Sequence, residues 1–256
     1  MDLKLLVEIF NELASIEYRG PIIITDDQPA QGIAKGAGLF MPPIDVAFTG
    51  APFRCSVAAR AAFLTNMIME ALNTSHLQPH NLSLSHKVSP WSLYEFPNAS
   101  ATFQHVRHLA LHTGYRSNWC RAKHRIHGFV NDVASIPHLE ELPIDFSNGS
   151  KTWDKRHPDH EFIDRLCAEA IPTLKKLQLT GTCLNFDALL GFIWRNNAFK
   201  CISLQRNIIH SLPRSHHILL QSSSMNAIVD AVLKRQTHLD EVTVSDNSQR
   251  LLSFGW

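Results

Sequence analysis

The amino-acid sequence predicts an α/β fold in which helices and short parallel strands alternate and stack as a solenoid. Three features of its 256 residues lead to this prediction. Apolar residues recur in triplets spaced i, i+3, i+5, and the last four triplets each follow a helix-like segment by a few residues. The segments IPHLEEL (136–142) and IPTLKKL (171–177) are near duplicates. The triplets begin at positions 106, 139, 174, 199 and 239.

The spacing of apolar residues places the elements in order along the chain. Helical spacing predicts helices at 3–14, 56–73, 126–133, 162–170, 186–195 and 225–234. Short apolar runs predict strands at 22–24, 82–84, 106–111, 139–144, 174–179, 199–204 and 239–244. The segment 26–52 is rich in glycine, proline and small residues, so we expect a long loop there, with a strand fragment at 45–48. The segment 208–221 is less regular, and 251–256 either caps the open end or frays.

The expected repeats are uneven, because successive triplets lie 33, 35, 25 and 40 residues apart. We therefore expect an irregular, leucine-rich-repeat-like solenoid with a parallel sheet on one side and helices on the other. Asn207 and Asn247 each follow the last apolar strand position by three residues, where leucine-rich repeats often place an asparagine that bonds to turn backbone. A single domain is expected to span 1–256, with loop insertions at 26–56, 114–123 and 147–159.

Three stretches within 103–207 read FQHVRHLALHT, FVNDVASIPHLEELPIDF and IPTLKKLQLTGTCLNFDALLGFIWRNNAFKCISLQRN. They resemble the C-terminal, leucine-rich-repeat-like region of fungal F-box-type proteins. The opening LVEIFNELASIEYRGPIIITDDQPAQG is similar to an early segment of that family, so the likeness spans most of the chain. The resemblance implies the substrate-binding part of a ubiquitin ligase receptor, with a Skp-type adaptor as a partner if an F-box lies upstream.

The F-box itself is absent or degenerate in this sequence. The segment LKLLVEIFNEL at 3–13 echoes the "LP.ELL.EIF..L" opening of an F-box, but the proline and the two following helices are missing. We therefore interpret this segment as a repeat helix. A role in ubiquitin ligation is an implication of the resemblance and not of a motif in the chain.

Composition and charge exclude several classes of protein. Hydrophobic content of 45% and charged content of 18% are typical of a globular chain, and a net charge of +1 predicts neither nucleic acid nor a membrane surface as a partner. The five cysteines are scattered without a CxxC pair, which favours a reducing compartment. The first residues lack the apolar region of a signal peptide, and no run approaches the length of a membrane span. We expect a cytoplasmic or nuclear protein.

Two groups of histidine and cysteine could supply zinc ligands, but neither has the pattern of a zinc site. On the predicted strand His108 and His112 would lie about 13 Å apart, too far for one ion. No CxxC half-site accompanies either group, so we expect no metal and no cofactor. The two groups are His105, His108 and His112, and Cys120, His124 and His127.

The sequence also lacks a catalytic motif. Ser222–Ser224 directly precede the helix expected at 225–234, so we interpret them as its N-cap. The glycines of QGIAKGAG (31–38) lack the strand–turn–helix context of a phosphate-binding loop. The basic residues within 151–157 are interpreted as a solvated loop. We therefore predict that the protein is not an enzyme.

In each strand the residues between the apolar positions should point away from the helices, onto one exposed face of the sheet. This face is mostly small and polar, which suits recognition of a protein through many modest contacts, and an ordinary solvated face fits equally well. The candidate partner-binding residues are His108, His112, Glu141, Asp145, Lys176, Gln178, Thr180, Ser203, Gln205, Glu241 and Thr243.

We expect a non-enzymatic protein-recognition solenoid whose partner the sequence does not identify. One alternative is a scaffold or truncated gene product without a role in ubiquitin ligation. Another is a small hydrolase, which requires a deep pocket with converging polar groups.

Overall fold

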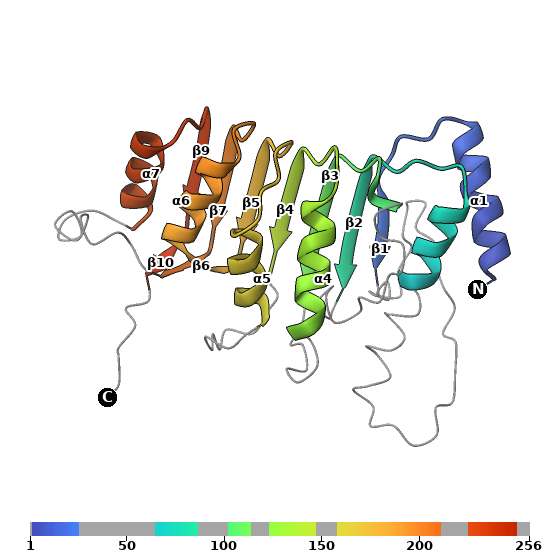
Figure 1. Ribbon diagram of the computed structural model, residues 1–256, viewed down its shortest axis with the longest axis horizontal. Helices are drawn as coiled ribbons and strands as arrows, with labels where there is room; N and C mark the ends of the chain where they lie inside the picture. Colours follow the sequence, from blue (N-terminus) through green and yellow to red (C-terminus); the bar gives the residue numbers. More distant parts are fainter. Residues whose placement is uncertain are drawn as a thin grey trace, which may run out of the picture.

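The computed structural model describes residues 2–25, 65–86, 102–113, 123–146, 158–210 and 225–249. Seven strands form one sheet, in which every neighbouring pair is parallel and the spatial order follows the chain (Figure 1). The predicted α/β class with a parallel sheet is confirmed. The strands are β1 (Ile22–Thr25), β2 (Asn81–His86), β3 (His108–Thr113), β4 (Glu141–Asp145), β5 (Lys176–Thr180), β7 (Cys201–Gln205) and β9 (Glu241–Ser245).

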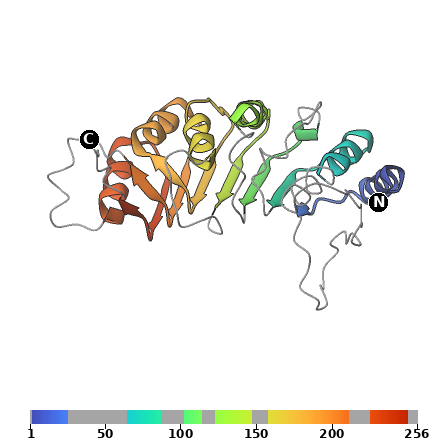
Figure 2. The same cartoon turned by 90° about the horizontal axis from the view of Figure 1, so that it is seen from below.

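Helices connect the strands and lie beside them. In Figures 1 and 2 the helices α4, α5 and α6 cover the same face of the sheet. Over the described ranges no helix crosses the opposite face, and none is long and apolar enough to cross a membrane. The helices are α1 (Leu3–Ser15), α4 (Lys123–Ala134), α5 (Pro158–Leu166), α6 (Phe186–Arg195) and α7 (Met225–Gln236), and residues 65–74 are also helical.

The register of the sheet aligns the apolar strand positions into rows that face the helices. Leu142, Leu177 and Ile202 are consecutive partners in one row, and each is at most 2% exposed. Val242 continues the row on the edge strand β9, where it is partly buried against the same core. Leu109 on β3 is fully buried as well. The predicted core positions therefore lie on neighbouring strands and point inward, so their burial stabilises the whole stack.

Helix α6 has the boundaries that the sequence predicts. The side chain of Asn185 accepts hydrogen bonds from the backbone N–H groups of Asp187 and Ala188, which caps the first turn. Arg195 lies in the last turn, where a cation interacts favourably with the helix dipole. One face of the helix is apolar and buried, and it consists of Phe186, Leu189, Leu190, Phe192 and Ile193.

A second, smaller sheet was not predicted. It contains β6 (Cys183–Asn185), β8 (Ile208–His210) and β10 (Ser248–Gln249), in the parallel order β10-β8-β6. Each of these strands follows a main-sheet strand after a turn with one residue at positive φ. These turn residues are Gly181 (65°), Arg206 (53°) and Asp246 (54°). The same backbone turn therefore recurs three times at equivalent positions.

Asparagine side chains join these turns, as the spacing of Asn207 and Asn247 predicts. Asn207 Oδ1 accepts from the backbone N–H of Thr182 at 2.9 Å, and Asn207 Nδ2 donates to the carbonyl of Leu179 at 2.9 Å. The backbone N–H of Asn207 in turn donates to Asn247 Oδ1 at 2.9 Å, and Asn247 Nδ2 donates to the carbonyl of Leu204. The predicted role of both asparagines in bonding turn backbone is confirmed.

The expected loop insertions fall largely outside the described residues. This holds for 26–56, for 114–122 and for 147–157, and also for the strand fragment at 45–48 and the serines 222–224. The two ends are corrected by the structure: residue 123 begins α4, and residues 158–159 begin α5. Pro158 fits the first turn of a helix because its missing N–H would have no partner there.

Candidate protein-recognition face

The sheet face opposite the helices carries the predicted partner-binding residues. On β3 and β4 the side chains of His108, His112, Glu141 and Asp145 are 36–46% exposed. The remaining predicted residues, Thr180 excepted, are exposed or partly exposed: Lys176, Gln178, Ser203, Gln205, Glu241 and Thr243. The alternation of the strands therefore brings ten of the eleven predicted residues to one accessible surface, which we call the sheet face.

Thr180 departs from the exposure expected of it. The residue is only 3% exposed, and its hydroxyl oxygen is buried. In the register of the sheet it lies between Asp145 and Gln205, two longer side chains, at the point where the chain turns into Gly181. A short side chain in that place offers a partner almost no contact area. Strand alternation places Thr180 correctly, but alternation alone does not predict how much of it neighbours cover.

The middle of the sheet face is lined by small or uncharged residues. Pro143, Gln178 and Ser203 are consecutive register partners, and Thr243 continues their row on β9. On β3 the same row contains Ala110, which is 5% exposed. A row without long charged side chains lets the backbone of a partner approach the strands closely, which favours binding over a broad, shallow surface.

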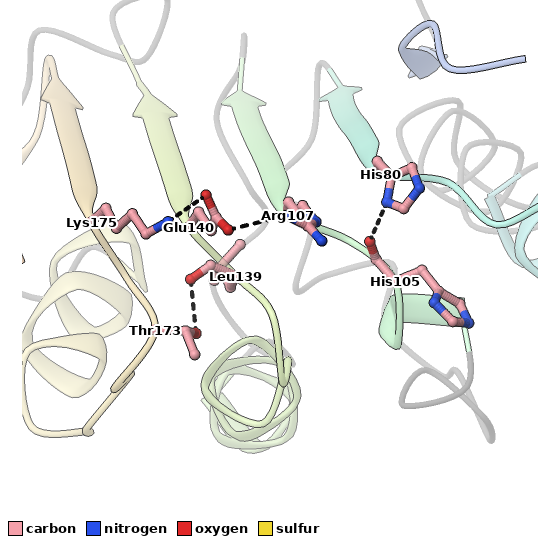
Figure 3. Close-up of polar contacts among 7 residues, drawn as sticks. All are labelled: His80, His105, Arg107, Leu139, Glu140, Thr173 and Lys175. Atoms are coloured by element: carbon pink, nitrogen blue, oxygen red, sulfur yellow. Dashed lines mark hydrogen bonds and ion pairs between the residues drawn. The ribbon is translucent and has the colours of Figure 1, made fainter. Parts of the chain in front are cut away.

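A row of polar residues, most of them charged, borders the sheet face where the strands begin, and the sequence analysis missed it. We call it the amino-end row, and Figure 3 shows its members from His80 to Lys175. Backbone bonds hold it in line: the carbonyls of Arg107, Glu140, Lys175 and Lys200 each accept from two N–H groups that start the next strand. The row consists of His80, Arg107, Glu140, Lys175, Lys200 and Asp240. Its sequence signal is a polar residue two positions before the first apolar position of each strand, as in EEL and KKL.

Ion pairs connect neighbours in the amino-end row. Lys175 Nζ lies 2.9 Å from Glu140 Oε2, Arg107 Nη1 lies 3.4 Å from Glu140 Oε1, and Lys200 Nζ lies 3.6 Å from Asp240 Oδ2. The hydrogen bond from Lys175 holds the pKa of the Glu140 carboxyl below its usual value, and the positive charge of Arg107 adds to this effect. The carboxylate is therefore ionised at neutral pH and fixes the two cations beside it.

Histidine–carboxylate pairs lie on the sheet face itself. His108 Nδ1 is 3.2 Å from Glu141 Oε2, and His112 Nδ1 is 3.9 Å from Asp145 Oδ2. Both pairs join β3 to β4, and all four side chains are substantially exposed. Exposed pairs of this kind contribute little to stability, typically about 0.2–1 kcal/mol when both groups are charged. They leave polar groups available to a partner.

The histidines give no metal centre within the described ranges. No group of three His, Cys, Asp or Glu residues there is placed to hold an ion. His127 Nδ1 instead accepts a hydrogen bond from Arg165 Nη1 at 2.7 Å, and His80 Nδ1 donates to the His105 carbonyl at 3.0 Å (Figure 3). Cys120 and the side chain of His124 lie outside the described residues.

Over the part of the chain that the structure describes, no hydrogen bond joins a nucleophile to a base in the hollows near the N-terminal part of the sheet. The larger hollow has a volume of about 380 Å³ and contains Ser75, His76 and His105 in its lining. The Ser75 hydroxyl donates to the Leu72 carbonyl at 3.1 Å and accepts from the N–H of Leu77. These bonds end the helix at 65–74 and leave the serine without the histidine contact that nucleophilic catalysis requires.

The thiols of Cys167 and Cys201 are poor nucleophiles. Burial raises the pKa of the Cys167 thiol from 9.0 to about 12. Burial, together with the nearby carboxylate of Glu241, also raises the pKa of Cys201 on the sheet face. Thiolates rather than thiols attack substrates, so neither residue suits a covalent mechanism at neutral pH.

The raised pKa of Cys167 predicts how stability changes with pH. Above pH 9.0 the thiol ionises in the unfolded chain but stays protonated in the folded one, so stability falls until about pH 12. Over this window the free energy of unfolding of the wild type should fall by up to about 1.4 kcal/mol per pH unit more than that of Cys167→Ala. Urea unfolding at pH 8, 9 and 10 measures the difference. Parallel pH profiles of the two proteins would contradict the prediction.

Comparisons with known proteins identify no relative: no family model, no curated protein and no solved structure matches the chain.

Proposed function

We propose that the protein is a non-enzymatic solenoid that recognises another protein through its sheet face. The observation that carries the proposal is the open face of the parallel sheet, where ten of the eleven predicted contact residues are accessible while helices cover the other side. Seven strands at about 4.8 Å spacing give a surface roughly 29 Å wide, which is broad enough for a protein segment. The row of small or uncharged residues in the middle of the sheet face lets a partner approach closely, and the amino-end row orients the partner by charge.

The recurrence of the same local structure supports a solenoid. The asparagine-bonded turn recurs after β5, β7 and β9, and a backbone carbonyl that accepts two N–H groups recurs before β2, β3, β4, β5 and β7. Each unit contacts its neighbours in chain order, as expected when repeats cannot bury their apolar faces alone. The irregular unit length follows from the uneven spacing of the strands in the sequence.

The resemblance to fungal F-box-type proteins suggests a narrower role as the substrate-binding part of a ubiquitin ligase receptor. Helix α1 buries Leu6 and Phe10 in the common core and leads into β1, which supports its interpretation as a repeat helix and not as an F-box. Under this proposal a Skp-type adaptor binds only if an F-box is encoded upstream of Met1. A chain that binds its partner but no adaptor acts as a scaffold.

Site-specific photo-crosslinking tests the use of the sheet face. A photoreactive phenylalanine analogue at Gln178 or Ser203, on the sheet face, should crosslink the same protein in cells of the native organism. The analogue at Asp187, which is exposed on α6, is the control and should not capture that protein. Equal capture from both sides, or capture only through α6, would overturn the proposal. Co-purification with a Skp-type adaptor tests the ligase role separately.

A further inference from the structure

The amino-end row alternates in charge except at one place. From β3 to β9 its residues are Arg107, Glu140, Lys175, Lys200 and Asp240, so only the step from β5 to β7 joins two like charges. The Lys175 carbonyl accepts from the N–H of Lys200 at 2.8 Å, so the two lysines are direct cross-strand neighbours. Like charges directly opposite each other on a sheet are destabilising, so this step works against the stability of the row.

A third lysine lies beside this step. Lys176 is exposed, and its register partners are Glu141 on one side and Cys201 on the other. Within the described structure no hydrogen bond or ion pair joins the Lys176 ammonium to a carboxylate. We call Lys175, Lys176 and Lys200 the lysine trio. The trio places three positive charges side by side, and the register partner of Lys176 on β7 is the thiol of Cys201 and not a carboxylate.

Acidic pairs flank the lysine trio on both sides. Glu140 and Glu141 precede or begin β4, and Asp240 and Glu241 do the same at β9. The side chains of Lys175 and Lys200 are 57% and 49% exposed, and those of Glu141 and Asp240 are 46% and 69% exposed. The border of the sheet face therefore presents the order acidic, basic, acidic to solvent, and a partner of complementary order would gain at all three places.

We propose that the partner segment places a carboxylate over the lysine trio, with a basic side chain on each side facing the acidic pairs. The inference rests on the proposed use of the sheet face. One and a half strand spacings, about 7 Å, separate the centre of the trio from β4 and from β9. In an extended segment, residues i and i+2 point the same way and lie about 7 Å apart, so the order is basic-x-acidic-x-basic. Four flanking carboxylates disfavour a doubly charged phosphate in the central position.

Binding of two labelled peptides to the full chain tests the charge order. Both peptides have the same composition, with balancing residues at their ends, but one is basic-x-acidic-x-basic in the centre and the other acidic-x-basic-x-acidic. At an ionic strength of about 0.01 M, where the Debye length is about 30 Å, the first should bind at least about fivefold more tightly. Fluorescence anisotropy measures both affinities. Equal affinities, or no binding of either peptide at about 1 mM, would overturn the inference.

Substitutions show whether the lysine trio causes the tighter binding of the basic-x-acidic-x-basic peptide. Lys176→Gln/Lys200→Gln should reduce the ratio of the two peptide affinities to less than about twofold. The matched control is Lys234→Gln/Arg235→Gln, which removes the same charge from the last turn of α7 and should leave the preference unchanged. A preference that survives the first double substitution contradicts the inference. If that variant melts more than about 5 °C below the wild type, Lys176→Gln alone, which breaks none of the ion pairs above, should still halve the preference.

The two tests fail independently. Crosslinking through Gln178 and Ser203 reports the use of the sheet face, whatever the charges of the partner are. A protein captured there, combined with peptides that bind without regard to charge order, would remove the role of the lysine trio and leave the recognition function in place.

Discussion

Replacement of Asn207 with alanine is expected to lower the free energy of unfolding by about 3–5 kcal/mol. Asn207 is fully buried, and its side chain accepts from both the N–H and the hydroxyl of Thr182 and donates to the Leu179 carbonyl. Alanine leaves the N–H and the hydroxyl of the buried Thr182 without their acceptor and removes a donor from the Leu179 carbonyl. Each buried polar group without a partner costs about 1–3 kcal/mol, so the losses add to a large effect. Urea denaturation monitored by circular dichroism measures it.

An exposed asparagine provides the control for this change. Asn197 lies in the turn between α6 and β7 and is exposed, so Asn197→Ala should change stability by less than about 0.5 kcal/mol. A loss below about 1 kcal/mol in Asn207→Ala would mean that the turn rearranges to satisfy its own backbone, and the role assigned to the asparagine would be wrong.

Phe162→Ala should lower the free energy of unfolding by about 3–5 kcal/mol, since it removes a large side chain from the centre of the core. Phe162 on α5 is fully buried, and its ring lies 5.7 Å from that of Phe129 on α4 and 6.3 Å from that of Phe146 after β4. The ring therefore joins two helices to the sheet, and alanine leaves a cavity among them. The midpoint of urea unfolding reports the change.

Leucine at the same position separates loss of volume from loss of aromatic contact. Phe162→Leu retains most of the apolar volume and should cost about 1–1.5 kcal/mol. If alanine and leucine destabilise equally, the ring contacts and not the filled volume dominate. If neither variant is destabilised by more than about 1 kcal/mol, the packing around Phe162 is looser than the structure indicates.

The sequence predicts the main sheet because burial leaves a clear pattern. Leu142 and Leu177 alternate with polar residues, and helices precede their strands with apolar residues at helical spacing. The strand starts, however, are predicted two residues early. Leu139, Leu174 and Phe199 begin the triplets and are fully buried, but they lie in the turns before β4, β5 and β7. The spacing of apolar residues therefore predicts which side chains contact the core, but it does not predict where backbone pairing between strands begins.

The small sheet and the charged border are predicted less well, for different reasons. Strands β6, β8 and β10 have two or three residues each, too few for any period to be visible, and they follow from the turn geometry at Gly181, Arg206 and Asp246. The amino-end row precedes the strands, where side-chain direction depends on the turn and not on strand alternation. Asn196, which is fully buried and accepts from the Ile171 N–H at 2.6 Å, gives no signal that separates it from its exposed neighbour.

The bonded asparagines have a consequence for how the C-terminal end opens. The N–H of Asn207 depends on Asn247, and the N–H of Thr182 depends on Asn207. Detachment of the segment that contains Asn247 therefore removes the hydrogen-bond acceptor of the Asn207 N–H. Movement of Asn207 in turn removes the acceptor of the Thr182 N–H. A chain linked in this way does not peel away one unit at a time from this end. We therefore expect the units that contain β5, β7 and β9 to unfold together, which would protect the border that these strands form from partial unfolding.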